Sequence, residues 1–590
     1  MFQSFEVTST PEKGPKRLAQ LRGEIAREGL DGFLVPRADR FQGEYVTPCD
    51  ARLAWLTGFT GSAGFCAALM DRAGVFVDGR YRTQVKSQVD LAYFTPVDWP
   101  ETTLADWLKQ ALPDGGRVGF DPWLHTKGEM EKLADCGVEL VAMDNLVDRI
   151  WADRPARPSG KIMDYPVEFA GETSGAKRKR IAADIKDGGS EAAVLTLPDS
   201  ICWLLNIRGS DIERNPVVQG FAILHADGQI DLFTDPAKAE GLALVVQPWE
   251  AFEPALKALQ GIVRVDPDTA PVAVSDILQG AGIEVQHKTD PCILPKACKN
   301  TTEIAGTRAA HLRDGVAMAN FLAWLDDAAS KGGLTEIEVV KKLEGFRRDT
   351  NALRDISFET ICGAGPNGAI IHYRVTEETN REIRKGELLL VDSGGQYLDG
   401  TTDITRTIAV GDVADEEKAC FTRVLQGMIA ISRARFPKGL AGRDLDALAR
   451  FPLWLAGQDY NHGTGHGVGT YLSVHEGPQR ISRASDVPLQ AGMILSNEPG
   501  YYREGAFGIR IENLIVVQPA PALQGADDRD MMAFETLTYV PIDKRLTKPD
   551  MLSSGERDWL NAYHAQTHKM LSPLVTEETL DWLTRACAPL

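Results

Sequence analysis

One pattern occurs twice in this chain and limits the folds open to it. The two copies begin at Trp55 and Trp203, 148 residues apart, and each repeats a Trp-Leu pair and a later Gly-Ser pair at that same offset. Each copy then runs into two short apolar stretches with turn residues between them, at 64–78 and 220–235. Apolar stretches joined by a short turn predict a β-hairpin. We therefore expect a duplication that produced two related α/β domains.

Breaks in composition divide the 590 residues further. A hydrophobic core stops growing at about 250 to 300 residues, so a chain of this length must form several domains. The Pro- and Gly-containing stretch at 153–160 has the composition of a linker, and the chain breaks again at 291–296. We predict four segments, namely residues 1–157, 158–296, 297–545 and a C-terminal helical extension at 546–590.

The third segment mixes helical and strand patterns. Asn300 followed by Glu303 forms a helix-capping pattern, which predicts that a long helix begins there. We predict helices at 300–330, 335–350, 414–434 and 443–457, and strands at 387–391, 402–409 and 509–517. This order predicts an α+β domain.

The charge balance argues against a nucleic-acid partner. The chain has 64 Lys and Arg against 83 Asp and Glu, a net charge of -19. A field of this sign repels phosphate backbones, and the longest basic run, Lys177 to Arg180, is better explained as a solvated helix face.

Cysteine usage and hydropathy favour a cytoplasmic protein. The nine cysteines are scattered and include no CxxC pair, which disfavours structural zinc and a disulfide framework. The first residues lack the pattern of a signal peptide, and no apolar run reaches the ~18 residues of a membrane span. We therefore expect no membrane association.

Histidines cluster in the third segment. His372, His462, His466 and His475 fall within about a hundred residues, among glycines and carboxylates. His462 and His466 share the glycine-rich stretch 462–469, where the backbone can approach a bound group closely. A flexible loop would not explain two histidines.

Four carboxylates accompany them. Asp392 closes an apolar strand, Asp403 lies in a run of Thr and Ile, and Glu498 lies where a strand turns. Taken alone, Asp392 is explained as a turn former, and Glu512 as the partner of Arg510 on a solvated strand face. Together with His466, however, these four carboxylates carry too much negative charge to share a site without cations. Two divalent ions would offset it, and oxygen ligands with a single nitrogen favour manganese, although zinc or cobalt could substitute.

The same residues carry a family resemblance. Five motifs, in order, are similar to those of aminopeptidase P: FETICGAGPNGAIIHY at 358–373, DSGGQYLDGTTDITRT at 392–407, HGTGHGVG at 462–469 with VHEGP at 474–478, NEPGYY at 497–502, and RIEN at 510–513. Outside this region, 203–216 and 559–564 resemble the long, three-domain, cytosolic form of that enzyme. The resemblance implies a pita-bread catalytic domain of peptidase family M24 preceded by two creatinase-like domains, and it implies a homodimer.

The resemblance also implies roles for individual residues. It makes Asp403 and Glu512 bridging ligands of two metal ions, with Asp392 completing one ion's shell and His466 with Glu498 the other's. A hydroxide between the ions would attack the bond before a penultimate proline, with Glu498 as proton shuttle and His475 as stabiliser of the tetrahedral intermediate. The resemblance also implies a catalytic role for His372, a proline pocket shaped by His372 and His462, and the orientation of Asp392 and Tyr502 by Arg510. The substrate-binding residues it implies are His372, His462, His475, Tyr502 and Arg510.

Two alternatives stay open. A prolidase would act on Xaa-Pro dipeptides only, and a non-catalytic pita-bread protein would bind peptides without cleaving them. Cleavage of an Xaa-Pro-Xaa tripeptide separates the expected aminopeptidase from both.

Overall fold

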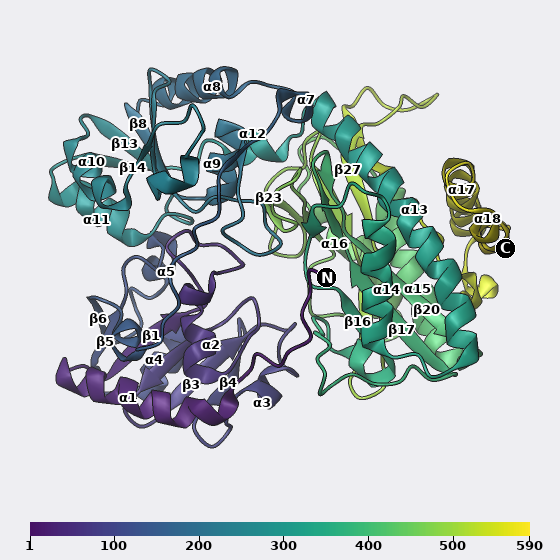
Figure 1. The fold of residues 1–590 in the computed structure, drawn as a ribbon, viewed down its shortest axis with the longest axis horizontal. Helices are drawn as coiled ribbons and strands as arrows, with labels where there is room; N and C mark the ends of the chain where they lie inside the picture. Colours follow the sequence, from purple (N-terminus) through teal and green to yellow (C-terminus); the bar gives the residue numbers. More distant parts are fainter. The chain divides into compact units, whose positions relative to one another are not determined.

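The computed structural model describes all 590 residues, which form two compact units. One unit is Thr8–Lys296, and the other combines Met1–Val7 with Ala297–Leu590 (Figure 1). The first seven residues thus group with the C-terminal unit, whereas the predicted first domain includes them. Phe5 explains this placement, because its side chain is buried in the apolar cluster that contains Phe321. Gln3 adds a pair of hydrogen bonds with Thr360, whose N–H donates to Gln3 Oε1 at 2.8 Å.

The unit Thr8–Lys296 contains two six-stranded sheets of the same topology. The first sheet has the order β4-β3-β2-β1-β5-β6, and the second has β12-β11-β10-β8-β13-β14. The first consists of β1 (Gly32–Pro36), β2 (Phe65–Leu69), β3 (Ala73–Val77), β4 (Thr95–Asp98), β5 (Arg117–Phe120) and β6 (Glu139–Ala142). The second consists of β8 (Ala192–Leu195), β10 (Phe221–His225), β11 (Ile230–Phe233), β12 (Val246–Gln247), β13 (Ile262–Val265) and β14 (Glu284–His287).

The pairing directions also match, strand for strand. In each sheet the two hairpin strands pair antiparallel with each other, and the first hairpin strand also pairs antiparallel with β1 or β8. The remaining pairs are parallel. Helices α1 (Gly14–Arg27) and α8 (Ser174–Asp187) precede the first strand of their respective sheets. The predicted hairpins and the predicted duplication are therefore confirmed.

Helix α8 corrects one expectation about the basic run. Lys177 is buried, and its ammonium donates to the Trp203 carbonyl at 2.9 Å and to Asn206 Oδ1 at 2.8 Å. Lys179 and Arg180 are exposed as predicted. The run is thus a solvated face with one lysine turned into the domain, where its hydrogen bonds offset the cost of burial.

The remaining helices of this unit are short. They are α2 (Arg52–Thr57), α3 (Val85–Gln88), α4 (Leu104–Ala111), α5 (Lys127–Lys132), α6 (Leu146–Ile150), α7 (Val167–Ala170), α9 (Pro198–Leu205), α10 (Phe252–Ala258), α11 (Val272–Gly280) and α12 (Ile293–Ala297). A two-strand ribbon joins β7 (Met163–Asp164) to β9 (Ile207–Arg208).

In the C-terminal unit, two long helices cover a three-stranded antiparallel sheet. The sheet has the order β16-β17-β20, formed by β16 (Ile361–Ala364), β17 (Glu387–Ser393) and β20 (Ile404–Val410). Helix α13 (Thr301–Lys331) lies beside α14 (Glu336–Arg348), and both bury apolar side chains against these strands (Figure 1). The predicted cap is confirmed, since Asn300 and Glu303 form a reciprocal capping box.

A six-stranded sheet and a second helix pair complete this unit. The sheet has the order β21-β28-β27-β24-β22-β23 and is joined by two smaller sheets, β25-β26 and β15-β18-β19. Its strands are β21 (Arg435–Pro437), β22 (Gly465–Gly467), β23 (Glu476–Ile481), β24 (Ile494–Asn497), β27 (Asn513–Pro519) and β28 (Met531–Thr536). The smaller sheets contain β25 (Gly500–Arg503), β26 (Phe507–Arg510), β15 (Asp355–Ile356), β18 (Gly395–Tyr397) and β19 (Gly400–Thr401). The helices are α15 (Asp415–Ser432), α16 (Arg443–Trp454), α17 (Ser554–Leu571) and α18 (Glu577–Ala586).

The predicted strand at 509–517 is two strands in the structure. β26 pairs with β25, whereas β27 pairs with β24 and β28, so the chain changes sheets between them. Glu512 lies at this change, and its N–H donates to the Thr405 carbonyl at 3.1 Å. The predicted helical extension after residue 545 is present as α17 and α18. None of the helices combines the length and apolar composition that crossing a membrane requires.

Candidate metal centre

Five strands of the C-terminal unit each carry or adjoin one predicted ligand. Every ligand lies in a strand or within two residues of one, which fixes its backbone through the sheet hydrogen bonds. The positions are Asp392 in β17, Asp403 directly before β20, His466 in β22, Glu498 directly after β24, and Glu512 between β26 and β27.

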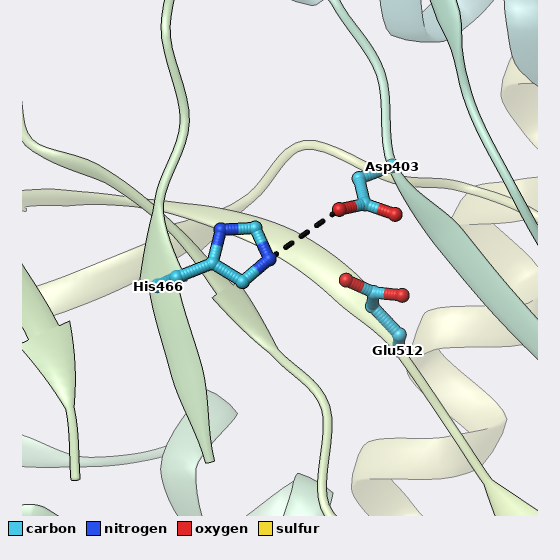
Figure 2. A group of neighbouring side chains, drawn as sticks. All are labelled: Asp403, His466 and Glu512. Atoms are coloured by element: carbon cyan, nitrogen blue, oxygen red, sulfur yellow. Dashed lines mark ion pairs between the residues drawn. The ribbon is translucent and has the colours of Figure 1, made fainter. Parts of the chain in front are cut away.

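Three of these side chains form a compact group of possible metal ligands. Asp403, His466 and Glu512 each offer one ligand atom, and these atoms lie within 4.8 Å of one another. Figure 2 shows the two carboxylates facing the imidazole, with His466 Nε2 3.5 Å from Asp403 Oδ2. Glu498 joins this group, because its Oε1 is 3.3 Å from the same imidazole nitrogen.

Burial makes this arrangement of acids costly without a cation. Asp392, Asp403 and Glu512 are 7%, 4% and 1% exposed. Burial raises the pKa of Asp392 to about 6, against the opposing charge of Arg510. Burial is the main reason why the pKa of Glu512 lies well above its usual value, and repulsion from Asp403, Glu498 and Asp392 raises it further. Since like charges in a buried site disfavour ionisation, bound divalent ions would favour the charged forms of Asp392 and Glu512.

The hydrogen bonds leave ligand atoms available for such ions. Asp392 Oδ1 and Glu512 Oε1 are buried and have no hydrogen-bond partner, while the second oxygen of each is held by a protein group. His466 Nδ1 lies 2.9 Å from the Gly467 carbonyl, so it carries the proton when the ring is neutral and leaves the Nε2 lone pair facing the carboxylates. The oxygen-rich donor set therefore fits two hard divalent ions.

Arg510 connects this centre to the tyrosine expected beside it. Its guanidinium donates to Asp392 Oδ2 at 2.5 Å, to the Tyr502 hydroxyl at 2.7 Å and to Thr405 Oγ1 at 3.2 Å. The predicted contacts of Arg510 with Asp392 and Tyr502 are thus present. Glu512 is almost fully buried and makes no ion pair with Arg510, so the solvated Arg–Glu pair considered for it is wrong.

The three other histidines lie around the group, partly exposed. The His475 ring lies edge-on to the His466 ring with centroids 4.3 Å apart. His462 Nε2 lies 2.9 Å from the Tyr502 hydroxyl. His372 follows Ile371, whose carbonyl accepts a long hydrogen bond of 3.5 Å from Arg510. The contacts thus place His475 beside His466, and they place His462, Tyr502 and Arg510 in one hydrogen-bonded set that ends at Asp392.

Several residues that support the ligands were not identified from sequence. Thr405 Oγ1 donates to Glu512 Oε2 at 2.7 Å, and Ser496 Oγ donates to Glu498 Oε1 at 2.9 Å. Each lies two residues from a predicted ligand, and this short separation in the sequence could have identified both. The buried ion pair between Asp446 and Arg450 was also missed, because it lies on a helix outside every motif.

Comparison with protein families agrees with this architecture. The model of metallopeptidase family M24 matches residues 305–519, and the model for the C-terminal region of that family matches 530–590. Two models of the creatinase/prolidase N-terminal domain match 17–150 and 153–303. The expected α+β fold, a pita-bread domain preceded by two creatinase-like domains, is thereby confirmed.

Similar proteins extend the match to the full chain. The protein named "Probable Xaa-Pro aminopeptidase P" of Laccaria bicolor is 40% identical over 98% of this chain and 93% of its own length. Aminopeptidase P2 of Arabidopsis thaliana is 39% identical over 95% of this chain and 86% of its own. The crystal structure of X-prolyl aminopeptidase from Caenorhabditis elegans, described as a cytosolic enzyme with a di-nuclear active site, superposes with a TM-score of 0.91 at 33% identity, covering 98% of this chain and all of that one. This chain therefore belongs to the Xaa-Pro aminopeptidase P family of M24 metallopeptidases.

Proposed function

We propose that this protein is a metal-dependent Xaa-Pro aminopeptidase, which removes the N-terminal residue of peptides with proline in second position. The observation that carries the proposal is the grouping of Asp403, His466 and Glu512 within 4.8 Å, with Glu498 beside His466 and with two buried carboxylate oxygens left unpartnered. Full-length similarity to proteins named for this activity supports it.

In this proposal Asp392, Asp403, His466, Glu498 and Glu512 hold two divalent ions. When bound, the ions would act as Lewis acids and lower the pKa of water, which is the chemistry that peptide hydrolysis needs. Glu498, oriented by Ser496, moves the proton from the attacking water to the leaving amine. His475, beside the His466 ring, donates to the carbonyl oxygen as negative charge develops on it.

The residues around the ions provide the substrate pocket. His372 and His462 shape the space for the proline ring, and Tyr502 borders it through its contact with His462. Arg510 keeps both Tyr502 and Asp392 in place. Proline's amide lacks an N–H, so recognition must rest on the shape of this pocket and on the free amine.

The metal identity and the location of the protein belong to the same proposal. Oxygen ligands with one imidazole nitrogen and no thiolate favour manganese over softer alternatives, with zinc and cobalt as substitutes. A cytoplasmic location is supported by the similar Caenorhabditis elegans protein, which is described as a cytosolic enzyme, and by nine cysteines that are all free. The net charge of -19 gives no support to nucleic acid as a partner.

The homodimer is supported by an apolar face on α16. Four large side chains at the end of this helix are strongly exposed: Leu448 at 43%, Phe451 at 56%, Trp454 at 42% and Leu455 at 75%. Exposed apolar side chains clustered on one helix are typical of a protein–protein contact. We propose that this face covers the equivalent face of a second copy. The domain limits at residues 157, 296 and 545 remain part of the proposal.

A hydrolysis assay tests the activity. Chelator-stripped protein is given manganese, zinc or cobalt separately, and is then offered an Xaa-Pro-Xaa tripeptide, the matching Xaa-Pro dipeptide and a tripeptide with alanine in place of proline. The proposal predicts metal-dependent release of the first residue from the proline tripeptide. Cleavage of the dipeptide alone would identify a prolidase, and cleavage of none of the peptides would identify a binding protein.

A further inference from the structure

We propose that Arg450, with its partner Asp446 one turn earlier on α16, is a positioning residue for the substrate pocket. It fixes the segment 459–464 that carries His462, and it thereby sets the His462 contact with Tyr502. The inference rests on the proposed function for its kinetic consequences only, since the contacts themselves are independent of it.

The guanidinium of Arg450 holds this segment at three places. Its Nη1 donates to Asp459 Oδ1 at 2.8 Å and to the Tyr460 carbonyl at 2.7 Å, and its Nη2 donates to the His462 carbonyl at 2.7 Å. The guanidinium also stacks on the Tyr460 ring, 3.9 Å from its centroid. A planar fork with several fixed donors is suited to hold a loop in one conformation, and a lysine cannot reproduce it.

Asp446 anchors both the arginine and the next part of the segment. Its Oδ2 accepts from Arg450 Nε at 2.7 Å, and its Oδ1 accepts from Thr464 Oγ1 at 2.6 Å. The Thr464 carbonyl in turn accepts from the Glu498 N–H at 2.8 Å. Asp446 and Arg450 are 1% and 3% exposed. A buried ion pair is costly to desolvate and is weak evidence for stability alone, so we infer a positioning role for this one.

The position of His462 has a defined chemical consequence. Its Nδ1 lies 2.7 Å from the Gly463 carbonyl, which only accepts, so Nδ1 carries the proton. Nε2 is then an acceptor in neutral His462, and the Tyr502 hydroxyl donates a hydrogen bond to it. The Tyr502 oxygen is free to accept from Arg510, whose other nitrogen holds Asp392. Hydrogen bonds thus lead from Arg450 to the His462 backbone, and from the His462 ring through Tyr502 and Arg510 to Asp392.

A double-mutant cycle tests this inference in the metal-loaded full chain. Arg450→Met removes the fork, His462→Ala removes the ring, and the third variant combines both. We expect Arg450→Met to raise KM for the Xaa-Pro-Xaa tripeptide about tenfold, with a smaller change in kcat, as is typical for loss of a group that orients a contact residue. We expect the double variant to be no worse than His462→Ala, because Arg450 acts through that ring.

Two further variants separate positioning from stability. Arg264 is a matched control, since it is also buried and donates to one carboxylate (Asp184) and one carbonyl (Thr289), but it lies in the N-terminal unit. Arg264→Met should lower stability while KM stays at the wild-type value. If Arg450→Met does not fold, Arg450→Lys keeps the charge without the fork and should still raise KM several-fold.

If the effects of Arg450→Met and His462→Ala on KM multiply in the double variant, the inference is wrong. A wild-type KM in both Arg450 variants would also overturn it. A readout without substrate keeps it distinct from the proposed function. When His462 is neutral, ¹⁵N-histidine NMR spectra of the resting enzyme should show a protonated Nδ1 and an unprotonated Nε2, and Arg450→Lys should shift these signals. If the His462 signals do not move, Arg450 does not position the ring, whatever the substrate proves to be.

Discussion

Loss of Arg510 should destabilise the C-terminal unit strongly in metal-free protein at pH 7.5. The guanidinium is 2% exposed and bonds Asp392, Tyr502 and Thr405 at 2.5, 2.7 and 3.2 Å. Removing one partner of a buried ion pair costs about 3 to 5 kcal/mol, because the other charge is left unpaired. We therefore expect Arg510→Met to lower the free energy of unfolding of this unit by about 4 kcal/mol. Arg510→Lys keeps the charge but cannot bond both Asp392 and Tyr502, so about half of that loss should remain.

Hydrogen exchange measured by mass spectrometry along a urea series can locate this effect. Peptides from β17 and β26 report on the C-terminal unit, and peptides from β8 and β10 serve as an internal reference in the other unit. The expected result is a loss of protection in β17 and β26 but not in β8 and β10. A change below about 1 kcal/mol there, or an equal change in both units, would refute the idea that Arg510 offsets the charge of Asp392.

Three other predictions concern the acids and the surface. The pKa of Asp392 is raised from 3.8 to about 6, so the stability that this group contributes is full below pH 3.8 and is lost as the pH rises through 6. In metal-free protein this loss is about 3 kcal/mol. Urea titrations at pH 4 and 7 should show the loss, and bound metal should abolish it. Asp403→Asn should bind at most one metal ion per chain by plasma emission spectrometry, and two ions would contradict a bridging role. Phe451→Glu should sediment at 64.5 kDa and wild type at twice that mass, whereas equal masses would remove this face from the dimer contact.

Prediction from the sequence succeeded for features that are determined by residues close together in the chain, namely hairpins and helix caps. The matching hairpins at 64–78 and 220–235 predicted the duplication, because a turn between apolar strands encodes both strands. Asn300 and Glu303 predicted the start of α13 for a similar local reason. The candidate metal ligands were selected as a set from their charge, although no single carboxylate carried that interpretation.

The orientation of α16 could not be predicted in this way. An amphipathic helix is expected to bury its apolar side chains and expose its charges. In α16 the reverse holds for key residues, since Asp446 and Arg450 are buried while Phe451 and Trp454 are exposed. The buried charges are satisfied by the backbone of 459–464, a contact that follows from tertiary structure alone. The change of sheets at Glu512 was missed for the same reason, because an uninterrupted strand-like run does not reveal which partner each half will pair with.

The most direct test of the central claim is a metal titration of chelator-stripped enzyme that follows release of the first residue from an Xaa-Pro-Xaa tripeptide. The five ligands predict that activity appears only with bound metal and reaches its maximum at two divalent ions per chain. Full activity without metal, or a maximum at one ion, would contradict a two-ion centre formed by Asp392, Asp403, His466, Glu498 and Glu512.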